Sequence, residues 1–240
     1  MTLHTRLVEY RDADLVCQGY LAWDDALPGP RPAVAVAHTW GGRSEFEGDK
    51  ARRLAALGYL GFAIDLYGGG RQGGSPEGNA ALMQPLMRDR GALQRRMIAG
   101  IEALRAQPEA DPQRIAAIGY CFGGLCVLDL ARTGADIRGV ASFHGLFDPP
   151  GNTAGNRIGA KVLCLHGYDD PMAKPETMLQ LATELTAAGA DWQIHAYGHT
   201  LHAFTRPDAN DPARGIGYNA AADRRSWRAL EDFLHEVFSS

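Results

Sequence analysis

Short apolar runs that alternate with helical segments constrain the fold of this chain most. From residue 32 onward these runs contain few charged residues, which is typical of strands covered by helices on both faces. The runs occupy residues 32–38, 60–66, 114–118, 137–143, 161–166 and 192–197. Because helical segments separate most of them, successive strands are joined by crossovers, and the sequence predicts a mostly parallel α/β sheet.

The helical segments are recognised by apolar residues that recur every three or four positions. They occupy residues 44–57, 79–107, 122–132, 175–188 and 218–238. Ser44 is a candidate N-cap and Gly58 a stop signal for the first helix, whereas the second is expected to break near Pro85 or Gly91.

The N-terminal segment follows a different pattern. Residues 3–10 and 15–23 alternate apolar and polar side chains around a short polar turn, which indicates an antiparallel β-hairpin. No repeat or linker interrupts the pattern that follows, so we expect one domain over residues 1–240.

Composition limits the partners of the chain. Its 240 residues are 45% hydrophobic and 22% charged, as in an ordinary globular protein rather than a disordered one. A formal net charge of −4 argues against a nucleic-acid surface, and no apolar stretch is long enough to cross a membrane. The N-terminus does not resemble a targeting signal and the four cysteines have no disulfide or metal spacing, so a cytoplasmic location is expected.

The sharpest motif is Gly119-Tyr120-Cys121-Phe122-Gly123, which lies between a predicted strand and a predicted helix. This is the pattern of a nucleophile elbow with cysteine in place of serine. The glycines allow strand and helix to approach closely, and the helix N-terminus favours a thiolate on Cys121. The alternative is a buried structural cysteine that follows a tight turn.

An elbow nucleophile requires an acid and a histidine later in the chain. Asp169 and Asp170 follow the strand over 161–166, and His199 and His202 follow the strand over 192–197. Ligands in parallel sheets bind at the carboxyl ends of the strands, where these residues are expected to lie. From the residues alone, either member of each pair remains a candidate.

Four stretches together resemble the dienelactone hydrolase (carboxymethylenebutenolidase) family of the α/β-hydrolase superfamily. They are His-Thr-Trp-Gly-Gly at 38–42, Ile-Asp-Leu-Tyr-Gly at 64–68, Gly-Tyr-Cys-Phe-Gly-Gly at 119–124 and His-Ala-Phe-Thr-Arg at 202–206. The resemblance implies the α/β-hydrolase fold, in which helices flank a mostly parallel central sheet, here preceded by the N-terminal antiparallel hairpin. We expect no cofactor and no metal.

The same resemblance implies roles for individual residues. It assigns a catalytic triad to Cys121, Asp170 and His202, and an oxyanion hole to the backbone amides of Thr39 and Phe122. It also assigns Arg206 to a substrate carboxylate.

The sequence departs from the family pattern in two places. His38 stands where the family has a glutamate, and would act as a second proton acceptor or only line the pocket. A second carboxylate-binding arginine, with a tyrosine four residues later, is missing after Tyr67. Trp40, Tyr67, Tyr120 and Phe204 lie beside strand ends, where they would either bind substrate or pack in the core.

These features predict a cysteine-nucleophile hydrolase that opens activated esters or lactones, its small-molecule substrates, through a thioester acyl-enzyme. One alternative is a promiscuous arylesterase that also attacks activated phosphotriesters, and another is a non-catalytic binding module. Less favoured are a metal site at His195, His199 and His202, and a redox pair of Cys121 with Cys126. Oligomeric state leaves no signal in the sequence.

Overall fold

The computed structural model describes residues 2–26 and 28–239. The chain divides into two compact units, Met1–Ile118 and Gly119–Ser240. The single domain expected over residues 1–240 therefore stays a prediction.

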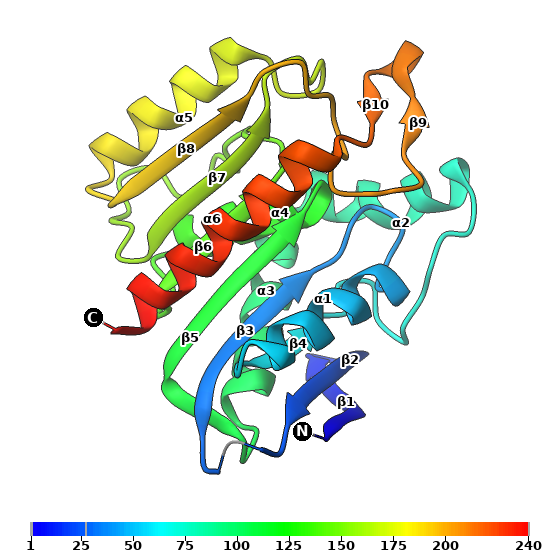
Figure 1. Cartoon of the computed structure of the whole chain (residues 1–240). Coiled ribbons are helices and arrows are strands. Elements are labelled where there is room, and N and C mark those ends of the chain that lie inside the picture. Colours follow the sequence, from blue (N-terminus) through cyan, green and yellow to red (C-terminus); the bar gives the residue numbers. More distant parts are fainter. Residues whose placement is uncertain (1, 27, 240) are drawn as a thin grey trace. The chain divides into compact units, whose positions relative to one another are not determined.

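The first unit contains the predicted hairpin. Strands β1 (Leu3–Asp12) and β2 (Leu15–Asp24) pair antiparallel over ten residue pairs (Figure 1). The hairpin continues onto strands β4 (Leu60–Ala63) and β3 (Arg31–Ala37), which run parallel to each other. The strand order is β1-β2-β4-β3-β5, with β5 spanning Ala110–Tyr120.

Three helices belong to the first unit. They are α1 (Glu45–Ala56), α2 (Pro76–Arg88) and α3 (Arg90–Arg105). Ser44 caps α1 as predicted, because its Oγ accepts the Phe46 N–H while Glu47 accepts the Ser44 N–H. Pro85 lies inside α2, and the predicted break occurs at Asp89, whose Oδ1 accepts the Ala92 N–H at 2.9 Å.

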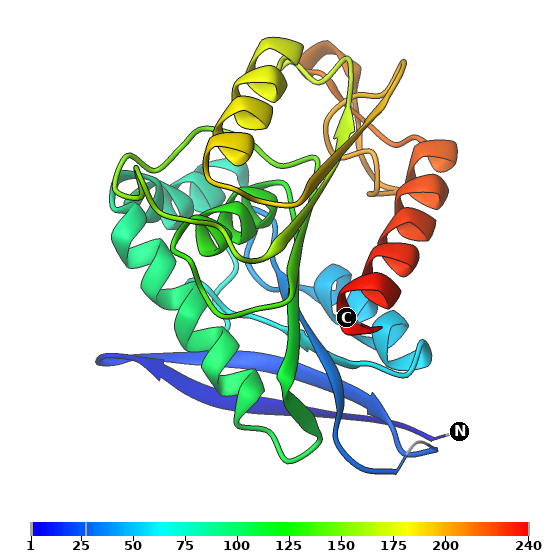
Figure 2. The ribbon, with the colours of Figure 1, turned by 90° about the vertical axis from the view of Figure 1, so that its left-hand side faces the viewer.

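The second unit begins with the end of β5 and contains both helices and strands, with β6 and β7 joined by a segment that has no helix. Its elements are α4 (Phe122–Arg132), β6 (Gly139–Phe143), β7 (Lys161–Gly167), α5 (Pro175–Ala187), β8 (Trp192–Tyr197) and α6 (Ala220–Ser239). Strands β6, β7 and β8 pair parallel in that order. Figure 2 shows α6 on one face of these strands and α4 and α5 on the other.

One element was not expected. After β8 the chain forms a small hairpin of β9 (Asn210–Asp211) and β10 (Ile216–Gly217), joined by a 3₁₀ turn at Pro212–Arg214. Strands of two residues are too short to produce a hydrophobic period, so the sequence pattern could not reveal them.

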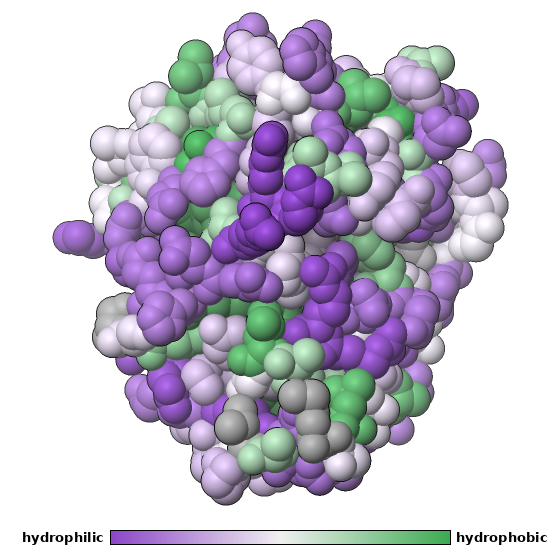
Figure 3. Space-filling view, viewed as in Figure 1, coloured by the Kyte–Doolittle hydropathy of each residue, from purple (hydrophilic) through white to green (hydrophobic). Residues whose placement is uncertain are grey.

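The predicted fold class is confirmed. The sheets are mostly parallel, helices flank them, and the N-terminal pair of strands is the antiparallel hairpin. None of the helices in the described residues is long and apolar enough to cross a membrane. Hydrophilic residues dominate the face in Figure 3, where hydrophobic residues appear in small separate areas.

Candidate active site

Cys121 occupies the turn between β5 and α4. Its backbone has φ 57° and ψ −115°, a conformation that L-residues rarely adopt outside functional turns. The turn is tight because a Cβ placed on Gly119 would lie 2.0 Å from the Gly123 carbonyl oxygen. A Cβ on Gly124 would lie 2.7 Å from the Cα of Gly145. Glycine at these positions therefore allows the sharp bend that places Cys121 at the start of α4.

His202 and Asp170 form a buried pair in the same unit. The His202 Nδ1 lies 2.7 Å from Asp170 Oδ2, and neither side chain is more than 3% exposed. The other carboxylate oxygen of Asp170 accepts the Met172 N–H at 2.8 Å, which fixes the carboxylate plane. This contact orients the ring so that Nε2 remains for another partner.

Cys121 acts on that imidazole. Burial alone lowers the pKa of His202, but the negative charge of Cys121 and the hydrogen bonds of Asp170 and Cys121 raise it to about 10. Nε2 has no nitrogen or oxygen partner among the described residues. A histidine with so high a pKa keeps its proton at neutral pH, so the ring is positively charged there.

The neighbouring acid and histidine lie at the surface. His199 Nδ1 is 3.8 Å from Asp169 Oδ2, and their side chains are 102% and 46% exposed. Solvent weakens such a pair, so it provides little orientation. The structure thus brings Asp170 to His202 and leaves Asp169 and His199 in solvent.

The small hairpin holds the backbone of His202. Its N–H donates to the Gly215 carbonyl at 2.9 Å, and its own carbonyl accepts the Gly217 N–H at 3.0 Å. A Cβ on Gly215 would lie 2.1 Å from Pro171, the residue after Asp170. The hairpin therefore connects the segments that carry the acid and the histidine, a role that the sequence reasoning missed.

His144 is the second feature that sequence reasoning missed. It follows β6, is fully buried, and has φ 38°. The Cys121 N–H donates to its Nδ1 at 3.1 Å. The rule that selected the other strand ends would have found it, because it comes directly after the apolar run over 137–143.

Two aromatic residues predicted near the site are core residues. Phe204 is fully buried and packs edge-on against His144 and Tyr197. Tyr120 is also fully buried and stacks on Phe143, with 4.6 Å between ring centroids.

Arg206 binds the carboxylate of Asp208, which lies two residues later in the same loop. Its Nε and Nη2 lie 3.0 Å and 2.6 Å from the two carboxylate oxygens of Asp208. Any carboxylate brought by a substrate would have to compete with Asp208 for this guanidinium.

The remaining predicted residues belong to the first unit. His38 is fully buried; its Nδ1 donates to the Thr39 carbonyl at 2.6 Å, and its Nε2 accepts the Leu66 N–H at 3.2 Å. Burial lowers the pKa of His38, so the ring is held neutral. Both nitrogens of His38 are engaged with backbone groups, which favours a structural role.

Thr39 and Trp40 follow His38 in that unit. The Thr39 N–H donates to Glu47 Oε1 at 3.1 Å. Trp40 is 36% exposed, and its carbonyl accepts the Tyr67 hydroxyl at 2.9 Å. These contacts fix the loop, and an oxyanion-hole role for Thr39 stays a prediction.

The groups considered for metal or redox chemistry lie apart. Within residues 2–26 and 28–239 no three His, Cys, Asp or Glu side chains gather as a metal site. The four cysteines form no disulfide with one another; three are buried, and Cys121 is half-buried. Burial raises the pKa of Cys17 to about 11 and that of Cys164 to about 12, as expected for unreactive core thiols.

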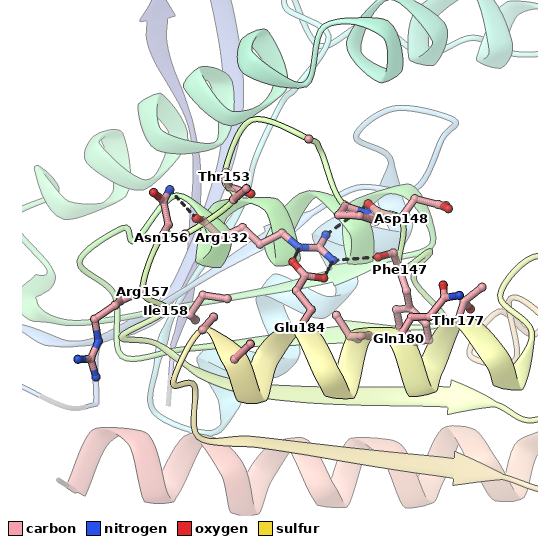
Figure 4. Close-up of a pocket in the computed structure, with 17 residues that line it drawn as sticks. Arg132, Phe147, Asp148, Thr153, Asn156, Arg157, Ile158, Thr177, Gln180 and Glu184 are labelled. Atoms are coloured by element: carbon pink, nitrogen blue, oxygen red, sulfur yellow. Dashed lines mark hydrogen bonds and ion pairs between the residues drawn. The ribbon is translucent and has the colours of Figure 1, made fainter.

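A cavity of about 520 Å³ lies at the opposite end of α4 from Cys121. It is bounded by α5 and by the connection between β6 and β7, and Arg132 and Glu184 meet at its centre (Figure 4). None of Cys121, Asp170 and His202 lines it.

The model of the dienelactone hydrolase family matches residues 17–238. The chain belongs to the dienelactone hydrolase family. This confirms the resemblance seen in the sequence, and it makes the protein a dienelactone hydrolase-like hydrolase. The family places an esterase-type activity on the α/β-hydrolase fold.

Three relatives illustrate the similarity. The crystal structure of a dienelactone hydrolase-like promiscuous phosphotriesterase from metagenomic libraries is 38% identical, with a TM-score of 0.93 over 99% of this chain and 100% of that chain. A putative carboxymethylenebutenolidase of Synechocystis is 27% identical over 97% of this chain and 96% of its own length. An uncharacterised protein of Caenorhabditis elegans is 36% identical over 62% of this chain and 96% of its own length.

Proposed function

We propose that this dienelactone hydrolase family member cleaves activated carboxylic esters or lactones with Cys121 as nucleophile. The observation that carries the proposal is the buried Asp170–His202 pair, whose imidazole is also acted on by Cys121 at the strained elbow. The carboxylate orients the ring, and the ring keeps the thiolate available.

In the first half of the reaction the Cys121 thiolate attacks the carbonyl carbon and forms a tetrahedral oxyanion. The carbonyl then reforms as the alkoxide or enolate leaves, and protonated His202 gives its proton to that oxygen. The product of this half is a thioester on Cys121. In the second half His202 takes a proton from water, the hydroxide attacks the thioester, and the acid departs as the thiolate is restored.

The oxyanion needs preorganised N–H donors. Phe122 is the first residue of α4, so its N–H lies at a helix terminus where the helix dipole favours negative charge. The Thr39 N–H is already donated to Glu47 Oε1 at 3.1 Å, so the proposal rests on the Phe122 N–H alone.

The substrate class follows from the nucleophile and from Arg206. A thiolate leaves a tetrahedral intermediate more readily than an alkoxide does, so the reaction proceeds only with a leaving group at least as good as the thiolate. Because Asp208 binds the Arg206 guanidinium, we propose that uncharged enol lactones and aryl esters are preferred over carboxylate-bearing substrates.

The deciding experiment is Cys121→Ala with p-nitrophenyl acetate as substrate. We expect kcat/KM to fall at least about 10³-fold, because the covalent route is lost. Cys126→Ala is the matched control, since Cys126 is a buried thiol on the same helix and should leave activity little changed. Unchanged hydrolysis by Cys121→Ala would refute the mechanism and favour a non-catalytic or differently built site.

A titration tests the ionic part of the proposal. Histidine NMR should give a pKa of about 10 for His202 in the wild type and a lower one in Cys121→Ala, because the negative partner is gone. Equal values in both proteins would contradict a thiolate–imidazolium pair.

The leaving group provides a separate test. Hydrolysis of p-nitrophenyl acetate should be much faster than that of ethyl acetate. Similar rates for the two esters would show that the thiolate does not limit the substrate range.

A second candidate activity is slow attack on activated phosphotriesters. It is favoured by the 38% identity, over nearly the whole chain, to a promiscuous phosphotriesterase of this family. A p-nitrophenyl phosphotriester should release p-nitrophenol in a Cys121-dependent way. Absence of release above the Cys121→Ala background would remove this candidate.

A further inference from the structure

A second histidine lies beside the proposed nucleophile and has no part in the mechanism above. His144 ends β6 in a positive-φ conformation that costs free energy for a non-glycine residue. Its own N–H donates to the Leu165 carbonyl on β7 at 2.9 Å. A strained backbone held in this way marks the side chain as a candidate for function.

The hydrogen bonds of His144 define its tautomer. The Cys121 N–H donates to Nδ1 at 3.1 Å, so Nδ1 carries no proton. The proton of the neutral ring is therefore on Nε2, which lies 2.8 Å from Thr205 Oγ1 and donates to it. A proton on Nδ1 would face the N–H of Cys121, so the two hydrogen bonds fit the tautomer with its proton on Nε2.

The ring of His144 also contacts the base. Its centroid lies 5.2 Å from that of His202 at an interplanar angle of 67°, and it meets Phe204 edge-on at the same distance. Thr205 lies three residues after His202, so one imidazole joins the nucleophile's backbone to the segment that carries the base.

We propose that His144 is a positioning residue. Its unprotonated Nδ1 accepts the Cys121 N–H and its Nε2–H donates to Thr205, and together these contacts hold the Cys121 elbow and the His202 ring in fixed relative positions. The inference rests on the proposed function, because it presupposes Cys121 as nucleophile. The Cys121 N–H is shared between Nδ1 of His144 and the Phe143 carbonyl at 3.0 Å. Loss of the imidazole acceptor would remove one of these two contacts of the Cys121 N–H.

Two substitutions separate the roles of the two nitrogens. His144→Asn keeps an acceptor near the position of Nδ1 and tolerates a positive φ, whereas His144→Gln keeps a donor near Nε2 and loses the acceptor. We expect kcat for p-nitrophenyl acetate to fall about tenfold in the Gln variant with KM little changed, and much less in the Asn variant. Alkylation of the Cys121 thiol by iodoacetamide should slow in the same order.

Thr205 provides a second pair that leaves His144 in place. Thr205→Val removes the acceptor that fixes the tautomer, so the alkylation rate and kcat should both fall. Thr205→Ser keeps a hydroxyl acceptor, so both should stay close to their wild-type values. This pair keeps the test valid if His144→Gln fails to fold.

The outcomes are distinguishable from failure of the proposed function. Cys121→Ala that retains hydrolysis would overturn the nucleophile. Equal alkylation rates and kcat values for His144→Asn and His144→Gln, or for Thr205→Val and Thr205→Ser, would overturn the positioning role. The buried cysteines do not compete for the label, and Cys121→Ala provides the unlabelled control.

Discussion

The two ends of α4 differ in how their buried polar side chains are paired. At the carboxyl end Arg132 is 2% exposed, and its guanidinium binds Asp129, Glu184 and the carbonyls of Phe147 and Asp148. At the amino end His202 pairs with Asp170 through Nδ1, and its Nε2 has no nitrogen or oxygen partner among the described residues.

Both ends are fixed to the same connection between β6 and β7. His144 at its start accepts the Cys121 N–H, and the carbonyls of Phe147 and Asp148 accept from Arg132. One end pairs its charge entirely with groups of the fold, whereas the other keeps one ring nitrogen for a further partner, as the proposed mechanism requires.

The largest expected effect is at the amino end. Asp170→Asn should lower kcat/KM by roughly 10³-fold or more, because the carboxylate no longer orients and stabilises the imidazolium of His202. Asp169→Asn is the matched control, since that side chain lies in solvent and should leave kcat/KM little changed. Equal losses in the two variants would end the distinction between the buried and the exposed acid.

The next effect is on stability at the carboxyl end. Arg132→Met should lower the free energy of unfolding by about 3–5 kcal/mol, because Asp129 is fully buried and would lose its charged partner. Urea unfolding measures this loss, and hydrolysis per folded molecule should be unchanged. Arg157→Met is the control, because Arg157 lines the same cavity but is exposed. A stable Arg132→Met with impaired hydrolysis would reverse the assignment of the two ends.

The smallest effect concerns His166, a buried histidine near the end of β7. Its ring centroid is 5.1 Å from that of Phe147, and Asp170 acts on it electrostatically. Burial lowers the pKa of His166, while Asp170 and the backbone of Ala173 partly oppose this shift. Over a range of pH the His166 ring therefore stays neutral in the folded state, whereas in the unfolded chain it has already taken up a proton.

The sign of the pH dependence follows from that difference. Below about pH 6.5 the unfolded state binds more protons than the folded state. The free energy of unfolding should therefore decrease as the pH is lowered, by at most about 1.4 kcal/mol per pH unit for this group. His166→Leu should reduce the slope measured by urea unfolding, whereas His235→Gln at the surface should not. An unchanged slope in His166→Leu would show that His166 is protonated in the fold.

The sequence predicts the fold well because strands β3, β4, β6 and β7 are buried on both faces, whereas β8, which has the same apolar pattern, is an edge strand and is half-exposed. The helix over 122–132 has the predicted bounds, and Ser44 caps α1 as expected. The break between α2 and α3 is at Asp89 rather than at Pro85, because the Asp89 side chain can cap the new helix. Local signals of this kind are present in the sequence even when a stronger helix breaker lies nearby.

The site is less readable from sequence. The motif around Cys121 predicts the elbow, but spacing does not reveal that Asp170 is buried against His202 while Asp169 is exposed. His144 and Thr205 meet 61 residues apart in the chain, which no local pattern encodes. The competition of Asp208 for Arg206 likewise depends on side-chain orientation rather than on residue type.

The strain at residue 121 has one more consequence. The backbone angles belong to the turn and not to the sulfur, so the Cβ of whatever residue stands there is aimed in the same direction. A single-base change from cysteine to serine would replace a soft, more acidic thiol with a hard, less acidic hydroxyl at the same position in the turn. The nucleophile can therefore change while the backbone of the turn stays the same.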